Sequence, residues 1–245
     1  PEWMHGFRDG TLGTEEEVEF GLNRSFGLAA SSWTEDEWRT YRSAYRHYMT
    51  YLDRQLGIIL DALERSGLAE NTVVIYTSDH GDHDGEHGLT MKRSFYEASS
   101  HVPMIMSWPG KIPGNSIDSE HLVNNGIDLL PTLCEFAGGS PPDSLPGKSL
   151  VSVALEENED EWRKHIVCET VSGRMLRTLQ FKYSLFYFNG RSEEMLCDMR
   201  NDPGETVNLA GDANYFEILT DHRNALGEWV RLNRDKKGIV YHEAL

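Results

Sequence analysis

The stretch YTSDHGDHDGEHGLTMK, residues 76–92, concentrates side chains that can bind a metal ion. Its seventeen positions hold three histidines, four acidic residues and three glycines. A carboxylate beside an imidazole, as at Asp79 and His80, can hold a divalent cation, and glycines let the backbone turn sharply or approach a ligand closely. The stretch has no HExxH or EF-hand spacing. The residues alone therefore leave two interpretations open: a metal site, or a polar surface loop in which Asp79 caps a turn and the histidines are solvated.

Regular elements flank this stretch on both sides. A T-x-x-E capping box at Thr34 and Glu37 predicts the start of a long amphipathic helix that ends near Gly67. Residues 73–77 predict a strand that is apolar on both faces, as in the centre of a covered sheet. After the polar stretch, RSFYEASS predicts a short helix and VPMIMSWP a second strand. This order predicts an α/β fold, in which ligand-bearing loops gather at the carboxyl ends of central strands.

The carboxyl-terminal third predicts a second, smaller unit. A helix in NNGIDLLPTLCEFAGG, with Pro131 near its first turn, precedes the Pro-, Gly- and Ser-rich loop SPPDSLPGKS and the acidic run LEENEDEWRK. Short strands follow in HIVCET, RMLRTLQ, KYSLFYF and EEMLCDM, with turn-type connections that favour antiparallel pairing, and a helix from about Asp212 closes the chain. We therefore expect an α/β domain in residues 1–155 and a small subdomain of antiparallel strands plus a terminal helix in residues 156–245.

Composition restricts the partners of the chain. It carries 23 Lys plus Arg against 40 Asp plus Glu, a formal net charge of -17, which argues against nucleic acid or an anionic membrane surface. The sequence holds no apolar run long enough for a membrane span, and no signal peptide is visible at its amino terminus. The three cysteines have no CxxC spacing and predict buried thiols rather than a disulfide framework.

Several motifs together carry a family resemblance. The segment LDRQLGIILDALERSGLAENTVVIYTSDHGDHDGEHGLTMKRSFYEASSHVPMIMSWPG resembles the carboxyl-terminal half of the catalytic domain of type I sulfatases, within the alkaline-phosphatase-like superfamily. The segments NGIDLLPTLCEFAG, GRMLRTLQFKYSLFYF and EEMLCDMRNDPGETVNLA are similar to later parts of that family, in order and spacing. The resemblance implies the carboxyl-terminal part of a sulfatase α/β fold, followed by a small α+β subdomain with an antiparallel sheet.

The resemblance implies roles for three residues. Asp79 resembles the metal-ligand aspartate of sulfatases. His80 stands where many members have asparagine and where a minority, similar to choline sulfatases and phosphonate monoester hydrolases, have histidine. Lys92 resembles the lysine that contacts the sulfate group and acts in catalysis. A compact ammonium suits that role, because it can bind sulfate oxygens and offset the negative charge that builds on the leaving oxygen.

Three further histidines have less definite roles. His87 in GEHG and His101 in SHVP lie in short motifs that resemble those of the family. For both we expect a role in supporting the site rather than in ligating the metal. His83, flanked by Asp82 and Asp84, stands where an apolar residue is expected. It therefore faces either the substrate or solvent, and both interpretations stay open.

The nucleophile that the family needs is absent from this sequence. Sulfatases use a formylglycine made from the first residue of a C/S-x-P/A-x-R motif. Cys134, Cys168 and Cys197 begin CEFAG, CETVS and CDMRN, and Ser107 begins SWPGK, so none fits. The resemblance implies that the formylglycine and the further acidic metal ligands lie in a missing amino-terminal half. We therefore expect this chain alone to bind metal weakly and to turn over no sulfate ester.

In the intact protein, the implied reaction is hydrolysis of a small-molecule or saccharide sulfate ester. Ca²⁺ is the expected metal, with Mn²⁺ or another divalent transition metal as the alternative because His80 supplies a nitrogen ligand. Two other functions stay open, a phosphonate monoester or phosphodiester hydrolase of the same superfamily and a non-catalytic sulfatase-like binding module. Because members of the family are commonly exported, the resemblance implies a location in the periplasm or outside the cell.

Overall fold

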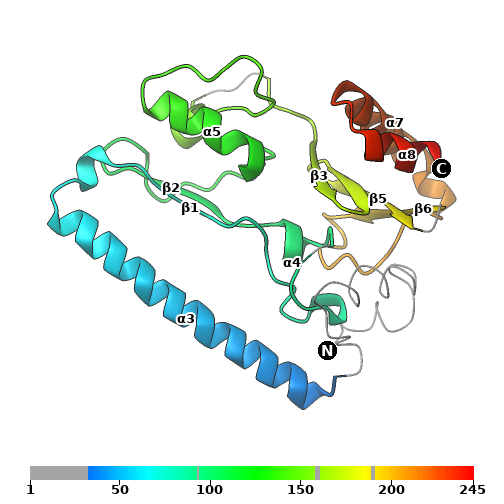
Figure 1. Cartoon of the computed structure of the whole chain (residues 1–245), viewed down its shortest axis with the longest axis horizontal. Coiled ribbons are helices and arrows are strands. Elements are labelled where there is room, and N and C mark those ends of the chain that lie inside the picture. The colour runs from blue at the N-terminus through cyan, green and yellow to red at the C-terminus, as the bar shows by residue number, and fades with distance from the viewer. Residues whose placement is uncertain (1–32, 93, 158–160, 189–190) are drawn as a thin grey trace. The chain divides into compact units, whose positions relative to one another are not determined.

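The computed structural model describes residues 33–92, 94–157, 161–188 and 191–245, and its elements are labelled in Figure 1. These elements group into two compact units. The amino-terminal unit contains residues 35–80 and 102–163, and the carboxyl-terminal unit contains residues 81–101 and 164–245. The polar loop 81–101 thus groups with the carboxyl-terminal strands, while the domain boundary expected at residue 155 stays a prediction.

A long helix begins the amino-terminal unit. Helix α3 spans Glu35–Arg65, with three acidic residues in its first turn and Arg65 in its last, an arrangement that complements the helix dipole. The chain leaves the helix at Gly67, whose φ of 71° suits a residue without a Cβ. The predicted helix from Thr34 to near Gly67 is therefore confirmed. The apolar residues along its middle are largely exposed, among them Tyr48, Tyr51, Ile58 and Ile59.

Two short strands follow. Strand β1 spans Val74–Thr77 and pairs antiparallel with β2, Met104–Ser107, so that Val74 lies opposite Ser107. Both predicted strands are confirmed as strands, but within the described residues β1 does not take the central place in a covered sheet that its apolar pattern predicts. In the described part of the chain β1 pairs with β2 alone, and its four side chains are half-buried. A 3-10 turn, η4 (Ala69–Asn71), precedes β1, and the indole Nε1 of Trp108 after β2 donates to the Glu70 carbonyl at 2.9 Å.

Helix α5, Asn125–Phe136, completes the framework of this unit, together with the short helix α6, Val151–Ala154. The Asn124 side chain caps α5 by accepting the Gly126 N–H at 3.0 Å. Pro131 lies in the second turn, one turn later than the sequence pattern predicts. The fully buried Asp128 carboxylate accepts hydrogen bonds from both terminal nitrogens of Arg163, at 2.8 and 2.6 Å. These bonds fasten α5 to the segment that leads out of the unit.

The carboxyl-terminal unit is built on an antiparallel meander. Its four strands lie in the order β3-β4-β5-β6. They span Ile166–Thr170, Gly173–Arg177, Phe181–Phe188 and Arg191–Asp198. The 3-10 turn η6 (Ala213–Tyr215) leads into α7, Phe216–Leu232, and α8, Lys236–Glu243, ends the chain. The antiparallel sheet and the helix α7 are confirmed predictions, whereas α8 was not predicted.

The core of this unit lies between the sheet and its two helices. It consists of buried side chains from β4, β5, β6, α7 and α8, namely Leu176, Phe181, Tyr183, Leu185, Leu196, Leu219, Leu226, Val230 and Tyr241. A smaller cluster of Leu89, Tyr96, Met195, Cys197 and Met199 joins the loop 81–101 to β6. Alternate residues of β5, namely Phe181, Tyr183 and Leu185, face this core, as the two-residue period of a strand requires.

The loop 81–101 is compact in itself. It contains the 3-10 turn η5, Glu86–Gly88, and the short helix α4, Glu97–Ser100, which confirms the short helix predicted there. Backbone bonds close it: Gly81 N–H donates to the Ser99 carbonyl at 2.8 Å, and His83 N–H to the Met91 carbonyl at 3.0 Å. Its two ends are therefore held together inside one unit.

The three cysteines are free thiols, and the prediction of buried thiols is confirmed for Cys197, whereas Cys134 and Cys168 are half-buried. Among the described residues, no helix is both long enough and apolar enough to cross a membrane.

Candidate active site

The end of β1 presents the two expected metal ligands. Asn125, the first residue of α5, donates from Nδ2 to the Ser78 carbonyl at 2.5 Å. The Ser78 hydroxyl in turn donates to the His80 carbonyl at 2.8 Å. The backbone that carries Asp79 and His80 is therefore fixed by β1 on one side and by the capped start of α5 on the other.

Asp79 and His80 form a close pair of ligand groups. The His80 Nε2 lies 3.4 Å from Asp79 Oδ2, while Oδ1 accepts the His80 backbone N–H at 3.1 Å. The Asp79 side chain is 84% exposed, so its carboxylate is open to a ligand. An oxygen and a nitrogen donor at this separation can serve the same cation.

This donor pair fits a divalent metal only in part. Among the described residues, no group of three or more His, Cys, Asp or Glu side chains is placed to hold a metal ion. Ca²⁺ takes roughly six to eight oxygen ligands, and one carboxylate with one imidazole falls well short of that number. Asp79 and His80 could thus supply two ligands of a metal site, and the remaining ligands must come from other groups.

Lys92, the residue expected to contact sulfate, ends the metal-capable stretch and belongs to the carboxyl-terminal unit. Its side chain is exposed, and the residue before it, Met91, has a φ of 67°. The bonds from His83 N–H to Met91 and from Gly85 N–H to Leu89 hold the backbone that leads to it. Asp79 and His80 belong to the other unit.

His83 is buried rather than exposed. Its ring has no exposed surface, its Nε2 lies 2.9 Å from the Ser94 hydroxyl, and its Nδ1 has no hydrogen-bond partner within the described residues. Burial, with a smaller contribution from His87, lowers the pKa of His83 to about 3, so the imidazole is neutral near pH 7. In this structure His83 therefore does not face solvent, and its contact with substrate stays a prediction.

His87 and His101 make different contacts. The His87 ring stacks on Tyr96 with centroids 3.7 Å apart, and burial followed by the charge of Lys182 lowers its pKa to about 4. The His101 Nδ1 lies 3.1 Å from Glu97 Oε2, and this hydrogen bond raises the pKa of His101. Both rings contact neighbours of the loop 81–101, and their supporting role stays a prediction.

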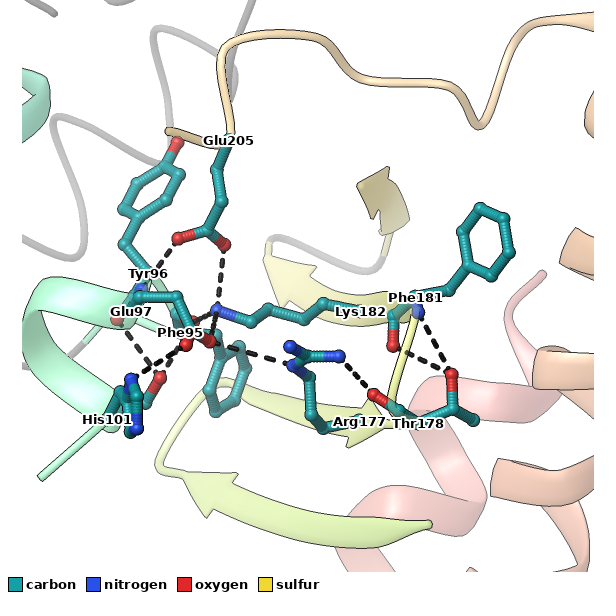
Figure 2. Close-up of polar contacts among 10 residues, drawn as sticks. Phe95, Tyr96, Glu97, His101, Arg177, Thr178, Phe181, Lys182 and Glu205 are labelled. Carbon is teal, nitrogen blue, oxygen red and sulfur yellow. Dashed lines mark hydrogen bonds and ion pairs between the residues drawn. The ribbon is translucent and has the colours of Figure 1, made fainter. Parts of the chain in front are cut away.

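A buried charged cluster was missed by sequence reasoning. In Figure 2, the Lys182 ammonium points between Glu97 and Glu205, which come from α4 and from the loop after β6. The pattern KYSLFYF predicts a strand, and RNDPGE a turn, without showing that their charged residues meet. The available signal was the single charged residue, Lys182, in a strand pattern rich in aromatic residues, since a lysine is almost never fully buried unless it is paired.

Two family models match the chain. The model described as Sulfatase covers residues 7–139, and the model described as N-sulphoglucosamine sulphohydrolase, C-terminal, covers residues 85–231. Each match spans more than half of the chain. Among curated proteins, the Delta 4,5-hexuronate-2-O-sulfatase of Bacteroides thetaiotaomicron is 36% identical over 216 residues, which are 84% of this chain and 44% of that protein. The chain thus spans less than half the length of this relative.

Several solved structures are also similar to this chain. A 2-O GAG sulfatase matches 92% of this chain and 50% of its own, with 32% identity and a TM-score of 0.85. A structure in complex with its substrate D-glucosamine-2-N,6-O-disulfate matches 76% and 40%, with 31% identity and a TM-score of 0.70. The phosphonate monoester hydrolase of Agrobacterium radiobacter matches 80% and 42%, with 28% identity and a TM-score of 0.70. Together with the family models, these likenesses show that this chain belongs to the sulfatase family.

Proposed function

We propose that this chain supplies the carboxyl-terminal part of the active site of an enzyme that hydrolyses sulfate esters. The observation that carries the proposal is the Asp79–His80 pair at the end of β1, in a chain of the sulfatase family. The pair offers an exposed carboxylate and a neighbouring imidazole nitrogen, held in place by Asn125 and Ser78.

Each residue of the proposed site has a separate task. Asp79 and His80 would hold the metal, Ca²⁺ in the first place and Mn²⁺ or another divalent transition metal as the alternative. The bound metal supplies positive charge that polarises the sulfuryl oxygens. The Lys92 ammonium binds the sulfate group and stabilises the charge that develops on the leaving oxygen. The nucleophile, a formylglycine, would come from an amino-terminal half of the protein, because no C/S-x-P/A-x-R motif occurs in this sequence.

For the substrate, we infer a sulfated saccharide. The support comes from the relatives: one is named for a hexuronate sulfate, and one solved structure holds a glucosamine disulfate as its substrate. A periplasmic or extracellular location would suit such a substrate, and it is part of the same proposal. Fractionation of the producing cell, followed by detection of the protein with an antibody, tests that location.

The metal role can be tested on this chain without any catalysis. Calcium binding is measured by titration calorimetry for the wild type, Asp79→Ala and Asp143→Ala, whose aspartate is exposed in the loop after α5. We expect weak binding, with a Kd on the order of 1 mM or above, that is lost in Asp79→Ala and kept in Asp143→Ala. Equal binding by all three proteins would overturn the assignment of Asp79.

The activity itself needs the full-length protein. We expect sulfate release from a sulfated saccharide to fall by roughly 10²–10³-fold in kcat for Lys92→Ala, the effect typical of removing one charge-stabilising donor. Asp79→Ala should be at least as impaired, and Asp143→Ala should match the wild type. Sulfate release by the 245-residue chain alone, lost in its Asp79→Ala variant, would refute the view that the nucleophile lies elsewhere.

Hydrolysis of a phosphonate monoester or phosphodiester is the second candidate. It is favoured by the likeness to the phosphonate monoester hydrolase, which is weaker than the likeness to the 2-O GAG sulfatase in identity, coverage and TM-score. Paired assays with sulfate esters and phosphate diesters carrying the same leaving group separate the two. A non-catalytic binding module is the third candidate, and an upstream coding sequence without the formylglycine motif would favour it.

A further inference from the structure

The ammonium of Lys182 in β5 is a buried charge, because the side chain has no exposed surface. Its Nζ donates to Glu97 Oε1 at 2.6 Å, to Glu205 Oε1 at 2.8 Å and to the Phe95 carbonyl at 2.8 Å (Figure 2). An ammonium has three protons, so these three acceptors satisfy it completely. Such a cluster has one preferred geometry.

Stability alone does not account for this cluster. A buried ion pair must repay the loss of water around each charge, and well-packed apolar residues of the same size are often as stable or more so. What a fully bonded buried cluster does provide is a single arrangement of the segments that meet in it.

The cluster joins three segments that are far apart in the sequence. Glu205 Oε2 accepts the Glu97 backbone N–H at 2.6 Å, across 108 positions, so Glu205 bonds both to the start of α4 and to Lys182. Glu205 itself has a φ of 52°, an unusual conformation for a residue with a side chain, and its N–H donates to the Asp202 carbonyl at 3.0 Å. The backbone of the turn after β6 thus aims this carboxylate at α4.

The position of α4 in turn fixes the loop that carries Lys92. The Ser99 carbonyl accepts the Gly81 N–H, and a Cβ added at Gly81 would lie 2.1 Å from the Ala98 carbonyl oxygen. Only glycine tolerates so close an approach, so α4 and the start of the loop are in direct backbone contact. Any shift of α4 must therefore move the ends of the segment between Gly81 and Ser99.

Glu97 has two further partners besides Lys182 and Glu205. Its carboxylate also faces His101 at 3.1 Å and Arg177 at 3.7 Å. Burial by itself would raise the pKa of Glu97, but the His101 hydrogen bond and the charge of Lys182 outweigh it and lower the pKa to about 2. Glu97 is therefore ionised at neutral pH and bonds to Lys182 as a carboxylate.

We propose that Lys182 and Glu205 are positioning residues for Lys92: they fix α4 and thereby hold the loop 81–101 in the conformation that presents the lysine to the sulfate group. The proposal rests on the proposed function for the role of Lys92. The structural half of it, that the cluster orders the loop, is independent of any activity.

The structural half is tested on the 245-residue chain by hydrogen exchange with mass spectrometry. Lys182→Met keeps the length of the side chain and removes its charge. The matched control is Arg174→Met: Arg174 is also buried and paired, with Asp235 at 2.5 Å, and its other bonds go to Glu169, Thr170 and Gly173, which lie outside the loop 81–101. We expect exchange in peptides of residues 81–92 to become roughly tenfold faster in Lys182→Met, the scale of one lost charged hydrogen bond, and to stay unchanged in Arg174→Met. Unchanged exchange in Lys182→Met, or equal acceleration in both variants, would overturn the proposal.

The catalytic half is tested on the full-length protein by a double-mutant cycle. We expect Lys182→Met to lower kcat at least tenfold in the wild type and to have no further effect in a Lys92→Ala background, because the two changes remove the same contribution. Additive effects would show that Lys182 acts independently of Lys92 and would overturn the positioning role. If the wild type releases no sulfate at all, the proposed function fails, and the hydrogen-exchange result still decides whether the cluster orders the loop.

Discussion

Asp128 offers the sharpest test of how the amino-terminal unit is held together. Its carboxylate is fully buried in α5 and accepts four hydrogen bonds. Two come from the Arg163 guanidinium, and two come from the backbone N–H groups of Lys148 at 2.9 Å and Asn124 at 2.8 Å. Asp128→Ala would leave a guanidinium that is only 13% exposed without its partner, together with two unpaired N–H groups.

The expected cost follows from these contacts. Removing one partner of a buried ion pair costs about 3–5 kcal/mol, and we take that range for the whole change because hydrogen bonds of one network are not additive. Asp128→Asn keeps one acceptor oxygen and loses the charge, so its cost should be about 1–3 kcal/mol. The exposed Asp143→Ala should stay within about 0.5 kcal/mol of the wild type.

Urea unfolding followed by tryptophan fluorescence measures these differences. The Trp162 indole reports on the same region, because its Nε1 donates to the Leu122 carbonyl at 2.9 Å and its ring lies 5.3 Å from the Arg163 guanidinium carbon. With a slope of about 2–3 kcal/mol/M, Asp128→Ala should lower the midpoint by more than ~1 M urea. Adding Arg163→Met should recover part of the loss, since no unpaired charge then remains.

The predicted cost of Asp128→Ala is wrong if the midpoint falls by much less than ~1 M urea. The prediction also fails if the double variant is less stable than the sum of the two single changes predicts, because the guanidinium would then be stabilising without its carboxylate. Asp143→Ala controls for the loss of an aspartate as such.

Three further predictions concern the carboxyl-terminal unit. The pKa of His83 is lowered to about 3 in the folded state, so the unfolded state binds more protons between that pH and about 6.5. The free energy of unfolding should therefore fall as the pH falls through this window, by at most about 1.4 kcal/mol per pH unit. His83→Gln should flatten this dependence, which urea unfolding at each pH measures. Gly81→Ala should cost about 1–3 kcal/mol in thermal unfolding, because its Cβ would strike the Ala98 carbonyl, and a stability equal to the wild type would contradict that contact. Cys197 is buried and its burial raises the pKa of its thiol, so iodoacetamide should label Cys134 well before Cys197 in the folded chain, as peptide mass spectrometry would show.

Much of the local structure could be predicted from the sequence, because its causes are local. The capping box at Thr34, the apolar period of three and four and the glycine at 67 mark α3, and its ends agree with the structure within a few residues. The alternating strands and short turns of the carboxyl-terminal sheet were predicted for the same reason. Helix α8 was missed because its eight residues carry little apolar periodicity, and its fit against the sheet depends mainly on Tyr241.

The candidate site divides in the same way. The types and spacing of Asp79, His80 and Lys92 are visible in the sequence, and so is the family to which the chain belongs. The surroundings of His83 are not visible in the sequence, since a histidine between two aspartates gives no sign that its ring is buried against Ser94.

The sequence by itself determined most of the elements, where the metal-capable residues stand and which family they indicate. Only the tertiary structure decided that the loop 81–101 belongs with the carboxyl-terminal sheet and that Lys182 is a buried ion rather than a surface lysine. The physical reason is the range of the contacts. The bonds of Lys182 to Phe95 and of Glu205 to Glu97 span 87 and 108 positions, and no local pattern of residues encodes a partner so far along the chain.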